Sequence, residues 1–159
     1  QIPEPMFVDV VKITTARGMF EAVTARAADQ DIIIKAAAVA DYRPKEVKNE
    51  KVKKSSSEIS LEMEKTDDIL KFLGEHKREG QFLCGFSMET ENMVENSRKK
   101  LEKKNLDLVV ANNLKVEGAG FLGDTNVVTL ISKDKEVSLP KMSKEETADH
   151  ILDAILYHN

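Results

Sequence analysis

The fold is most clearly indicated by residues Ile32–Lys54, which read IIIKAAAVADYRPKEVKNEKVKK. The first part, Ile32–Ala38, is a run of strand length that is rich in apolar residues, as in a strand buried on both faces of a sheet. The part from Asp41 to Lys54 is polar and basic and has no hydrophobic period, so it predicts a loop. In open α/β sheets, ligands bind beyond the carboxyl ends of the strands. The start of this loop is therefore a candidate site.

Strand-like and helix-like segments alternate along the rest of the chain. The expected strands are Ile32–Ala38, Glu58–Lys65, Phe82–Phe86, Leu106–Ala111, Val127–Ile131 and Glu136–Leu139, after a β-rich run at Phe7–Ile13. The expected helices begin near Thr15, Thr66, Glu91 and Ser143. This order predicts one α/β domain over residues 1–159 with a mainly parallel central sheet. The last two strands predict a late β-hairpin that extends one edge.

Side-chain patterns predict which faces are buried and where helices are capped. Apolar and polar residues alternate cleanly in Glu58–Lys65, which predicts a half-exposed strand with Ile59, Leu61 and Met63 on its apolar face. Thr15 and Thr66 are expected to be N-caps, and Ser143 with Glu146 has the spacing of a capping box. The residues expected on the inner face of the last helix are Ala148, Ile151, Leu152, Ile155 and Leu156.

The composition excludes several classes of protein. A chain of 159 residues, 41% hydrophobic and 33% charged, fits one soluble globular domain. Its longest purely apolar stretch, Ala36–Ala40, is too short to span a bilayer, and no signal peptide is expected. The net charge of -4 argues against a general affinity for nucleic acid. The one cysteine, Cys84, cannot form an internal disulfide, which suits a cytoplasmic location.

Two features at the end of the first long strand could bind a ligand. The small side chains of Ala36–Ala40 would let a ligand approach the backbone, although alanines also fit under a crossing helix. Asp41 would be a natural Mg²⁺ ligand, because Mg²⁺ takes one or two carboxylates together with phosphate oxygens. The alternative is that Asp41 caps a turn before Pro44.

Two groups of lysines could offset the charge of a polyphosphate. Lys51, Lys53 and Lys54 lie on the predicted loop, where they could close over an anion or form an ordinary solvated surface. Lys100 and Lys104 are four residues apart and share one helix face. Their mutual repulsion would be relieved by an anionic ligand, or by Glu95 and Glu102.

The remaining candidates are weaker. Phe86 could stack on a nucleobase, but a Phe in an apolar strand usually belongs to the core, and the same holds for Cys84. The three histidines lack metal-ligand spacing. The chain has no GxGxxG, P-loop, HExxH or GxSxG motif, which disfavours a flavin- or NAD-binding domain. Pattern alone indicates an anion site near Asp41 and the lysines.

The segment from Ala37 to Arg43, together with the KVKK of Lys51–Lys54, resembles the AAVAD…KxKK signature of bacterial phosphopantothenoylcysteine synthetase. Four further segments resemble motifs of that family in the same order: Thr66–Leu70, Gly85–Thr90, Lys100–Asp107 and Ala111-Asn112. The similarity runs from about Val8 to the final helix. The resemblance implies a Rossmann-like three-layer fold and a ligase of coenzyme A biosynthesis. In this family CTP and Mg²⁺ are used to join 4′-phosphopantothenate to cysteine through an acyl-cytidylate.

The resemblance also implies roles for individual residues. Lys51 would be catalytic, on a loop that closes over the intermediate, and Asp41 would lie at the metal. The nucleotide-binding residues that it implies are Ala36, Ala37, Asp41, Lys51, Asp67, Asp68, Ile69, Leu70, Phe86, Lys100 and Lys104. The expected partners are therefore CTP, 4′-phosphopantothenate and cysteine.

The family implies two further partnerships. Its members are dimers, and the expected contact here is the apolar face of Val127–Ile131 with Glu136–Leu139; the alternative is an edge hairpin packed within one subunit. The synthetase is usually fused to an FMN-dependent phosphopantothenoylcysteine decarboxylase. FMN is therefore expected only in a separate domain.

Two alternatives to CTP-dependent ligation stay open. The ligase could use ATP, as eukaryotic relatives do, or the chain could be a non-catalytic nucleotide-binding or dimerisation module. Family members also carry an N-terminal glycine-rich strand-turn-helix and an R-x-x-(S/T)N-x-S-x-G motif that this sequence does not contain. We therefore expect the domain to be incomplete at its N-terminus, and the 159 residues alone to bind CTP weakly or not at all and not to turn over.

Overall fold

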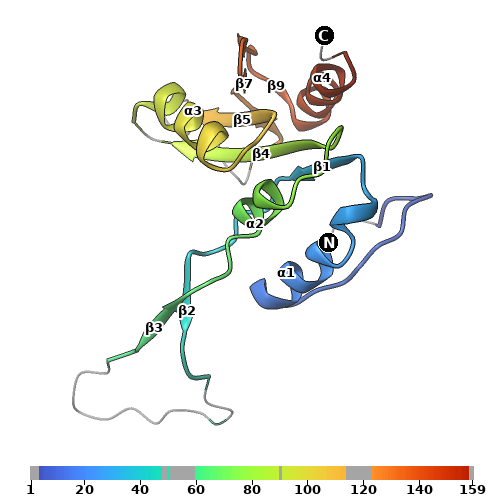
Figure 1. Ribbon diagram of the computed structural model, residues 1–159. Helices are drawn as coiled ribbons and strands as arrows, with labels where there is room; N and C mark the ends of the chain where they lie inside the picture. The colour runs from blue at the N-terminus through green and yellow to red at the C-terminus, as the bar shows by residue number, and fades with distance from the viewer. Residues whose placement is uncertain (1–3, 48–49, 51–59, 90, 114–122, 158–159) are drawn as a thin grey trace.

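A computed structural model describes residues 4–47, 50, 60–89, 91–113 and 123–157. Its centre is a five-stranded sheet in the order β1-β4-β5-β7-β8 (Figure 1). The strands are β1 (Ile32–Lys35), β4 (Phe82–Glu89), β5 (Leu108–Asn113), β7 (Val128–Ser132) and β8 (Glu136–Ser138). β1, β4 and β5 are parallel, whereas β7 pairs antiparallel with β5 and with β8. The predicted α/β fold with a late hairpin at one edge is confirmed.

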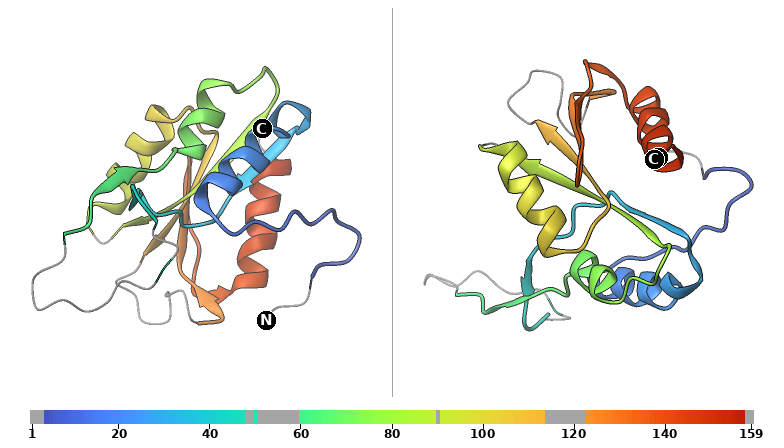
Figure 2. Two further views of the ribbon diagram at one scale, coloured as in Figure 1. Left: turned by 90° about the horizontal axis from the view of Figure 1, so that it is seen from below. Right: turned by 45° about the horizontal axis from the view of Figure 1, so that its top comes forward.

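Helices cover both faces of this sheet, which gives three layers (Figure 2). The helices are α1 (Ala16–Thr24), α2 (Ile69–Glu75), α3 (Met93–Lys103) and α4 (Lys144–Leu156), with a short 3-10 turn at Ala27–Asp29. Residues of α1, α2 and α3 pack with Leu83 and Val109, whereas those of α4 pack with Cys84 and Val110. Successive strand residues therefore face opposite layers, as the pleat requires.

The helix starts at Thr15 and Ser143 agree with the sequence. Thr15 Oγ1 accepts a hydrogen bond from Gly18 N at 2.9 Å, and Ser143 forms the predicted capping box with Glu146. The predicted inner face of α4 was too wide. Ile151 and Ile155 are buried, but the other three apolar residues predicted to face inward, Ala148, Leu152 and Leu156, are exposed. α4 meets the sheet along one narrow stripe because it has no described helix beside it on this face (Figure 2).

The prediction for the first long strand was wrong in two respects. β1 ends at Lys35 rather than at Ala38, and it is not buried on both faces. Ile32 and Ile34 are 42% and 41% exposed, whereas Ile33 packs on the side of α1 and α2. In the described sheet β1 is an edge strand, since β4 is its hydrogen-bonded neighbour there.

A two-stranded ribbon stands away from the sheet (Figure 1). It pairs β2 (Tyr42–Pro44) with β3 (Met63–Lys65), so the prediction of a loop from Asp41 onward was wrong at these three positions. The predicted apolar face of the second strand is also exposed, with Leu61 at 68% and Met63 at 48%. A ribbon that protrudes has no core of its own to cover such residues. Ile59 lies outside the described residues.

The prediction of a β-rich run at Phe7–Ile13 was wrong, since this segment forms no strand and is exposed. β6 (Thr125–Asn126) and β9 (Met142–Ser143) form a short antiparallel pair. The described residues do not include the loop lysines Lys51, Lys53 and Lys54, or most of the glycine-rich segment Lys115–Thr125. No helix in the described ranges is long and apolar enough to cross a membrane.

Candidate active site

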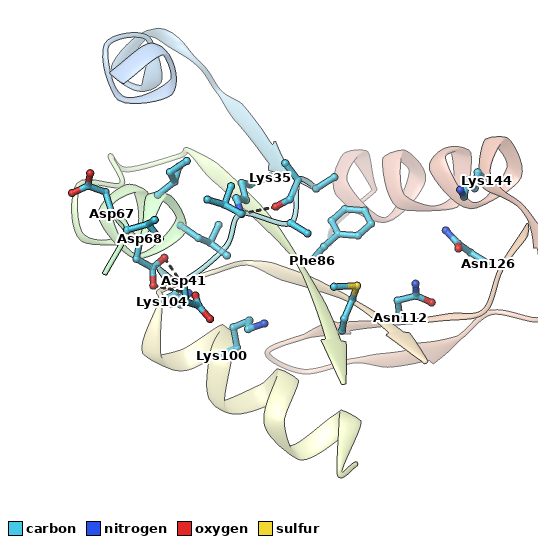
Figure 3. A pocket seen from close by; sticks show the side chains of 18 residues that line it. Lys35, Asp41, Asp67, Asp68, Phe86, Lys100, Lys104, Asn112, Asn126 and Lys144 are labelled. Carbon is cyan, nitrogen blue, oxygen red and sulfur yellow. Dashed lines mark hydrogen bonds and ion pairs between the residues drawn. The ribbon is translucent and has the colours of Figure 1, made fainter. Parts of the chain in front are cut away.

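A cavity of about 390 Å³ lies at the carboxyl ends of β1, β4 and β5 (Figure 3). This volume is in the range of small-molecule sites. The predicted site residues that line it are Ala36, Ala37, Asp41, Asp67, Asp68, Ile69, Leu70, Phe86, Lys100 and Lys104. The remaining one, Lys51, lies outside the described residues. These side chains meet because the carboxyl ends of parallel strands share one edge of the sheet, which is where α/β proteins bind ligands.

Two glycines allow α2 to approach this edge. A Cβ atom at Gly85 of β4 would lie 2.6 Å from Leu70 Cδ2, and one at Gly74 of α2 would lie 1.8 Å from the carbonyl oxygen of Lys104. A larger residue at Gly74 would push α2 away from the end of α3, and one at Gly85 would require α2 to move or Leu70 to change rotamer. The first turn of α2 and the side chain of Lys104 reach the same cavity for this reason.

The N-terminus of α2 is capped differently from the prediction. Asp68, not Thr66, is the N-cap, and its Oδ1 accepts a hydrogen bond from Lys71 N at 3.0 Å. Thr66 cannot cap this helix because its backbone continues the ribbon, where Thr66 N donates to Asp41 O at 2.9 Å. The hydroxyl of Thr66 donates instead to the carbonyl oxygen of Ala40.

The two lysines of α3 are compensated by carboxylates from other elements. Lys104 Nζ lies 2.8 Å from Asp68 Oδ2, and Lys100 Nζ lies 3.9 Å from Glu89 Oε1. The alternative that Glu95 compensates these lysines is not supported, because Glu95 pairs with Lys99 at 2.6 Å. Lys100 and Lys104 do line one side of the cavity, as their spacing predicts.

The proximity of these charges changes the proton affinity of the site. Burial, outweighing the attraction of Glu89, lowers the pKa of Lys100 from the ordinary value of 10.5. Burial would by itself raise the pKa of Asp68, but hydrogen bonds from Lys104 and from Lys71 N prevail and lower it from 3.8. The cavity thus holds a carboxylate that stays charged and an ammonium group that is easier to deprotonate than one on the surface.

Lys35 is a cavity residue that sequence reasoning missed. It is the last residue of β1, and its Nζ donates to the carbonyl oxygen of Ala37 at 2.6 Å (Figure 3). Burial, followed by repulsion from Lys104, lowers its pKa from 10.5. A signal was present, since Lys35 is the one charged residue between Ile32 and Ala40.

The far end of the cavity is built by residues that are distant in sequence. Asn112, from the family-like segment Ala111-Asn112, lies there near the end of β5, together with Asn126 of β6 and Lys144 of α4 (Figure 3). Sequence reasoning missed Asn126 and Lys144, because only the pairing of β6 with β9 brings them to this edge.

Asp41 could be one ligand of a Mg²⁺ site whose other ligands come from the substrate. The described residues contain no group of three or more His, Cys, Asp or Glu that could hold a metal by themselves. A Mg²⁺ ion bound by one or two carboxylates and by phosphate oxygens needs no such group. Asp41 lines the cavity on the same side as Asp68, so its carboxylate could supply one such ligand.

Two residues near these motifs belong to the scaffold. Asp107 lies at the amino end of β5, on the side of the sheet away from the cavity. There its carboxylate accepts hydrogen bonds from Lys77 Nζ at 2.9 Å and from Leu83 N at 2.7 Å. Cys84 is fully buried in the core, as expected, and burial raises the pKa of its thiol to about 12.

Comparison with known proteins agrees with this architecture. Residues 1–158 match the family described as the DNA/pantothenate metabolism flavoprotein C-terminal domain. The chain is 47% identical over 148 residues to the coenzyme A biosynthesis bifunctional protein CoaBC of Bacillus subtilis (strain 168), which covers 92% of this chain and 36% of that protein. The chain thus spans little more than a third of the length of this relative.

Solved structures show the same fold. The crystal structure of the C-terminal domain of a CoaBC protein superposes with a TM-score of 0.80 at 41% identity, over 99% of this chain and 71% of that one. A Cab2 variant in complex with phosphopantothenate-cysteine gives a TM-score of 0.70 at 19% identity, over 92% of this chain and 51% of that one, which is a likeness of fold. With a family match over nearly its whole length, this chain belongs to the DNA/pantothenate metabolism flavoprotein C-terminal domain family.

Proposed function

We propose that this chain is the synthetase domain that ligates 4′-phosphopantothenate to cysteine, with CTP as the activating nucleotide. The observation that carries the proposal is one cavity that gathers residues from all five family-like segments. Ala37 and Asp41 come from the first segment, the start of α2 from the second, Phe86 from the third, Lys100 with Lys104 from the fourth, and Asn112 from the fifth. Membership of a family whose relatives act in coenzyme A biosynthesis supports the same substrates.

The proposed reaction has two steps. A carboxylate oxygen of 4′-phosphopantothenate attacks the α-phosphorus of CTP, and pyrophosphate leaves with the electron pair of the broken P–O bond. The amine of cysteine then attacks the acyl carbon, the bond to CMP breaks, and the amine releases a proton to solvent. The first step brings an anion to a polyanion, so cationic side chains would contribute most by reducing that repulsion.

Lys100 and Lys104 are placed for this electrostatic work. Both lie on one side of the cavity, and each is paired with a carboxylate rather than surrounded by water. Cations in a partly desolvated site act more strongly on a phosphate than surface cations do. When bound, Mg²⁺ would add charge neutralisation between phosphate oxygens, and Asp41 is the residue that would hold it.

The ligation can be tested in the full-length gene product. Pyrophosphate release should require CTP, 4′-phosphopantothenate and Mg²⁺, and withholding cysteine should limit it to about one equivalent per site as the acyl-cytidylate accumulates. Lys100→Met should lower kcat/KM by about 10- to 100-fold, the scale expected when a charge-assisted contact is lost. Lys99→Met is the matched control, since Lys99 is an exposed neighbour on the same helix. Full activity of Lys100→Met would contradict the proposed site.

The alternatives predict different outcomes in the same assay. An ATP-dependent ligase would give a higher kcat/KM with ATP than with CTP. A non-catalytic nucleotide-binding module would bind CTP in calorimetry and release no pyrophosphate. CTP is favoured because the AAVAD…KxKK form of this sequence resembles the bacterial, CTP-using members.

Lys51 is proposed as the catalytic residue on the strength of the resemblance alone, since it lies outside the described residues. In the full-length gene product, Lys51→Gln should abolish turnover while CTP binding is retained. Unchanged turnover would remove Lys51 from the mechanism.

A homodimer also belongs to the proposal, but its expected surface needs correction. Every residue of β7 is buried within this chain, so residues 128–131 of the expected face are not available for a partner. β8 is the exposed strand of the hairpin, with Val137 48% exposed. Light scattering of the wild type and of Val137→Lys would test whether β8 carries the contact.

A further inference from the structure

The backbone of Ala36–Ala40 forms one wall of the cavity without a regular structure of its own. It lies between β1 and β2, has no helical or strand hydrogen bonds, and lines the cavity through Ala36–Val39. Its alanine side chains cannot hydrogen-bond. Any ligand recognition by this segment must therefore use its peptide groups, and such recognition is selective only if their directions are fixed.

Two side chains from outside the segment hold these peptide groups. The Lys35 ammonium donates to the carbonyl oxygen of Ala37 at 2.6 Å. The Thr66 hydroxyl donates to the carbonyl oxygen of Ala40. Within the described part of the chain these are the hydrogen bonds to this segment, one near its start and one at its end.

Each bond sets the direction of a whole peptide plane. In a trans peptide the C=O of one residue and the N–H of the next point in opposite directions. Turning the Ala37 carbonyl toward Lys35 therefore fixes the N–H of Ala38. Turning the Ala40 carbonyl toward Thr66 likewise fixes the N–H of Asp41.

We propose that Lys35 and Thr66 are positioning residues, whose hydrogen bonds orient the Ala36–Ala40 backbone for recognition of the nucleoside part of the nucleotide. The inference rests on the proposed function, because it assigns a role within that nucleotide site. It gives Lys35 a different role from that of Lys100 and Lys104. Those two ammonium groups are paired with carboxylates, whereas the ammonium of Lys35 is hydrogen-bonded to the backbone.

The competing role for Lys35 is that of a third phosphate-binding cation. The two roles predict opposite results with the two halves of the ligand. CMP contains the nucleoside but no pyrophosphate group. If Lys35 orients the backbone, Lys35→Met weakens the binding of CMP and leaves the binding of pyrophosphate unchanged. If Lys35 binds the triphosphate, Lys35→Met weakens the binding of pyrophosphate at least as much as the binding of CMP.

The experiment is calorimetry of CMP and of pyrophosphate with the full-length gene product. Lys35→Met and Thr66→Val should each raise the Kd of CMP about tenfold, as expected when one hydrogen bond is lost, with less than a twofold change for pyrophosphate. Thr66→Ser, which restores the hydroxyl, should recover CMP affinity. The preference for CTP over UTP in kcat/KM should fall in both weakened variants. Lys99→Met is the control for loss of one positive charge.

A second measurement requires no ligand. The ¹⁵N relaxation order parameters of the Ala36–Asp41 amides should fall in Lys35→Met and Thr66→Val and stay unchanged in Lys99→Met. If the wild type binds no CMP, the proposed nucleotide site itself fails. If the wild type binds CMP and both variants keep that affinity, or if the loss falls on pyrophosphate, only the positioning role is overturned. Unchanged order parameters would also overturn it.

Discussion

The ammonium group of Lys104 lies 2.8 Å from Oδ2 of Asp68, which joins the end of α3 to the N-cap of α2. The two residues are 36 positions apart, and each belongs to a different family-like segment. The Lys104 side chain is 20% exposed and that of Asp68 is 45% exposed, so the pair is partly shielded from solvent. One contact thus connects a cation of the cavity with the helix start that faces it.

Substitutions at Asp68 should separate its two structural roles. Asp68→Asn keeps an N-cap acceptor and loses the ion pair, so unfolding free energy should fall by about 0.5–1 kcal/mol. Asp68→Ala loses both roles and should lower it by about 1–2 kcal/mol. Urea unfolding measures both. If Asp68→Ala lowered the free energy of unfolding no more than Asp68→Asn does, the N-cap hydrogen bond would contribute nothing to stability.

Asp68 should also make stability depend on pH in acid. Its pKa is lowered in the folded chain from the ordinary 3.8, so the folded state binds fewer protons than the unfolded state near that value. The stabilisation is therefore complete above pH 3.8 and is lost as pH falls through the lower folded pKa. Unfolding of the wild type and Asp68→Asn between about pH 5 and 2 should show a shallower slope for the variant. Equal slopes would mean that the Asp68 pKa is not lowered.

Gly85→Ala should destabilise the chain and disturb the site together. The new methyl group would lie 2.6 Å from Leu70 Cδ2, so α2 must move or Leu70 must change rotamer. Overpacking of this kind costs about 1–3 kcal/mol. Adding Leu70→Val should recover part of the loss by making room for the methyl group. Chemical denaturation tests this, and an unchanged midpoint for Gly85→Ala alone would contradict the close packing.

Cys84 should be inert in the native state. Its side chain is fully buried and its pKa is raised to about 12, so at neutral pH almost none is thiolate. Iodoacetamide at pH 8 should label it at least about 100-fold more slowly in the folded chain than in 6 M guanidinium. Rapid native labelling would show that the core around β4 opens readily.

As the pH is raised, nucleotide affinity should begin to fall at a lower pH than it would if the anion were bound by exposed lysines. Burial lowers the pKa values of Lys35 and Lys100 from 10.5, so Lys100 loses its positive charge at a lower pH than an exposed lysine does. An anion bound through Lys100 is then held less tightly as pH rises toward 10.5. Calorimetry of CTP at constant ionic strength should show this decrease, and Lys100→Met should flatten it. Lys99→Met should keep the wild-type slope, and a wild-type affinity that stays constant up to pH 10.5 would refute the prediction.

The sequence alone determined the elements whose signals are local. The capping oxygens of Thr15 and Ser143 and the apolar runs of β4 and β5 need only their neighbours in the chain to be recognised. The order of strands and helices then implied a shared carboxyl edge. That rule placed a candidate site at Asp41, and the family resemblance added Phe86 and the start of α2 to it.

Tertiary structure decided whatever depends on contacts between distant segments. β1 is half-exposed because it lies at the edge of the described sheet, and Tyr42–Pro44 is a strand because β3 pairs with it. No local pattern could reveal that Lys104 meets Asp68 or that Lys144 reaches the cavity. A side chain's partner is set by the packing of whole elements, and a one-dimensional pattern records only which face a residue occupies.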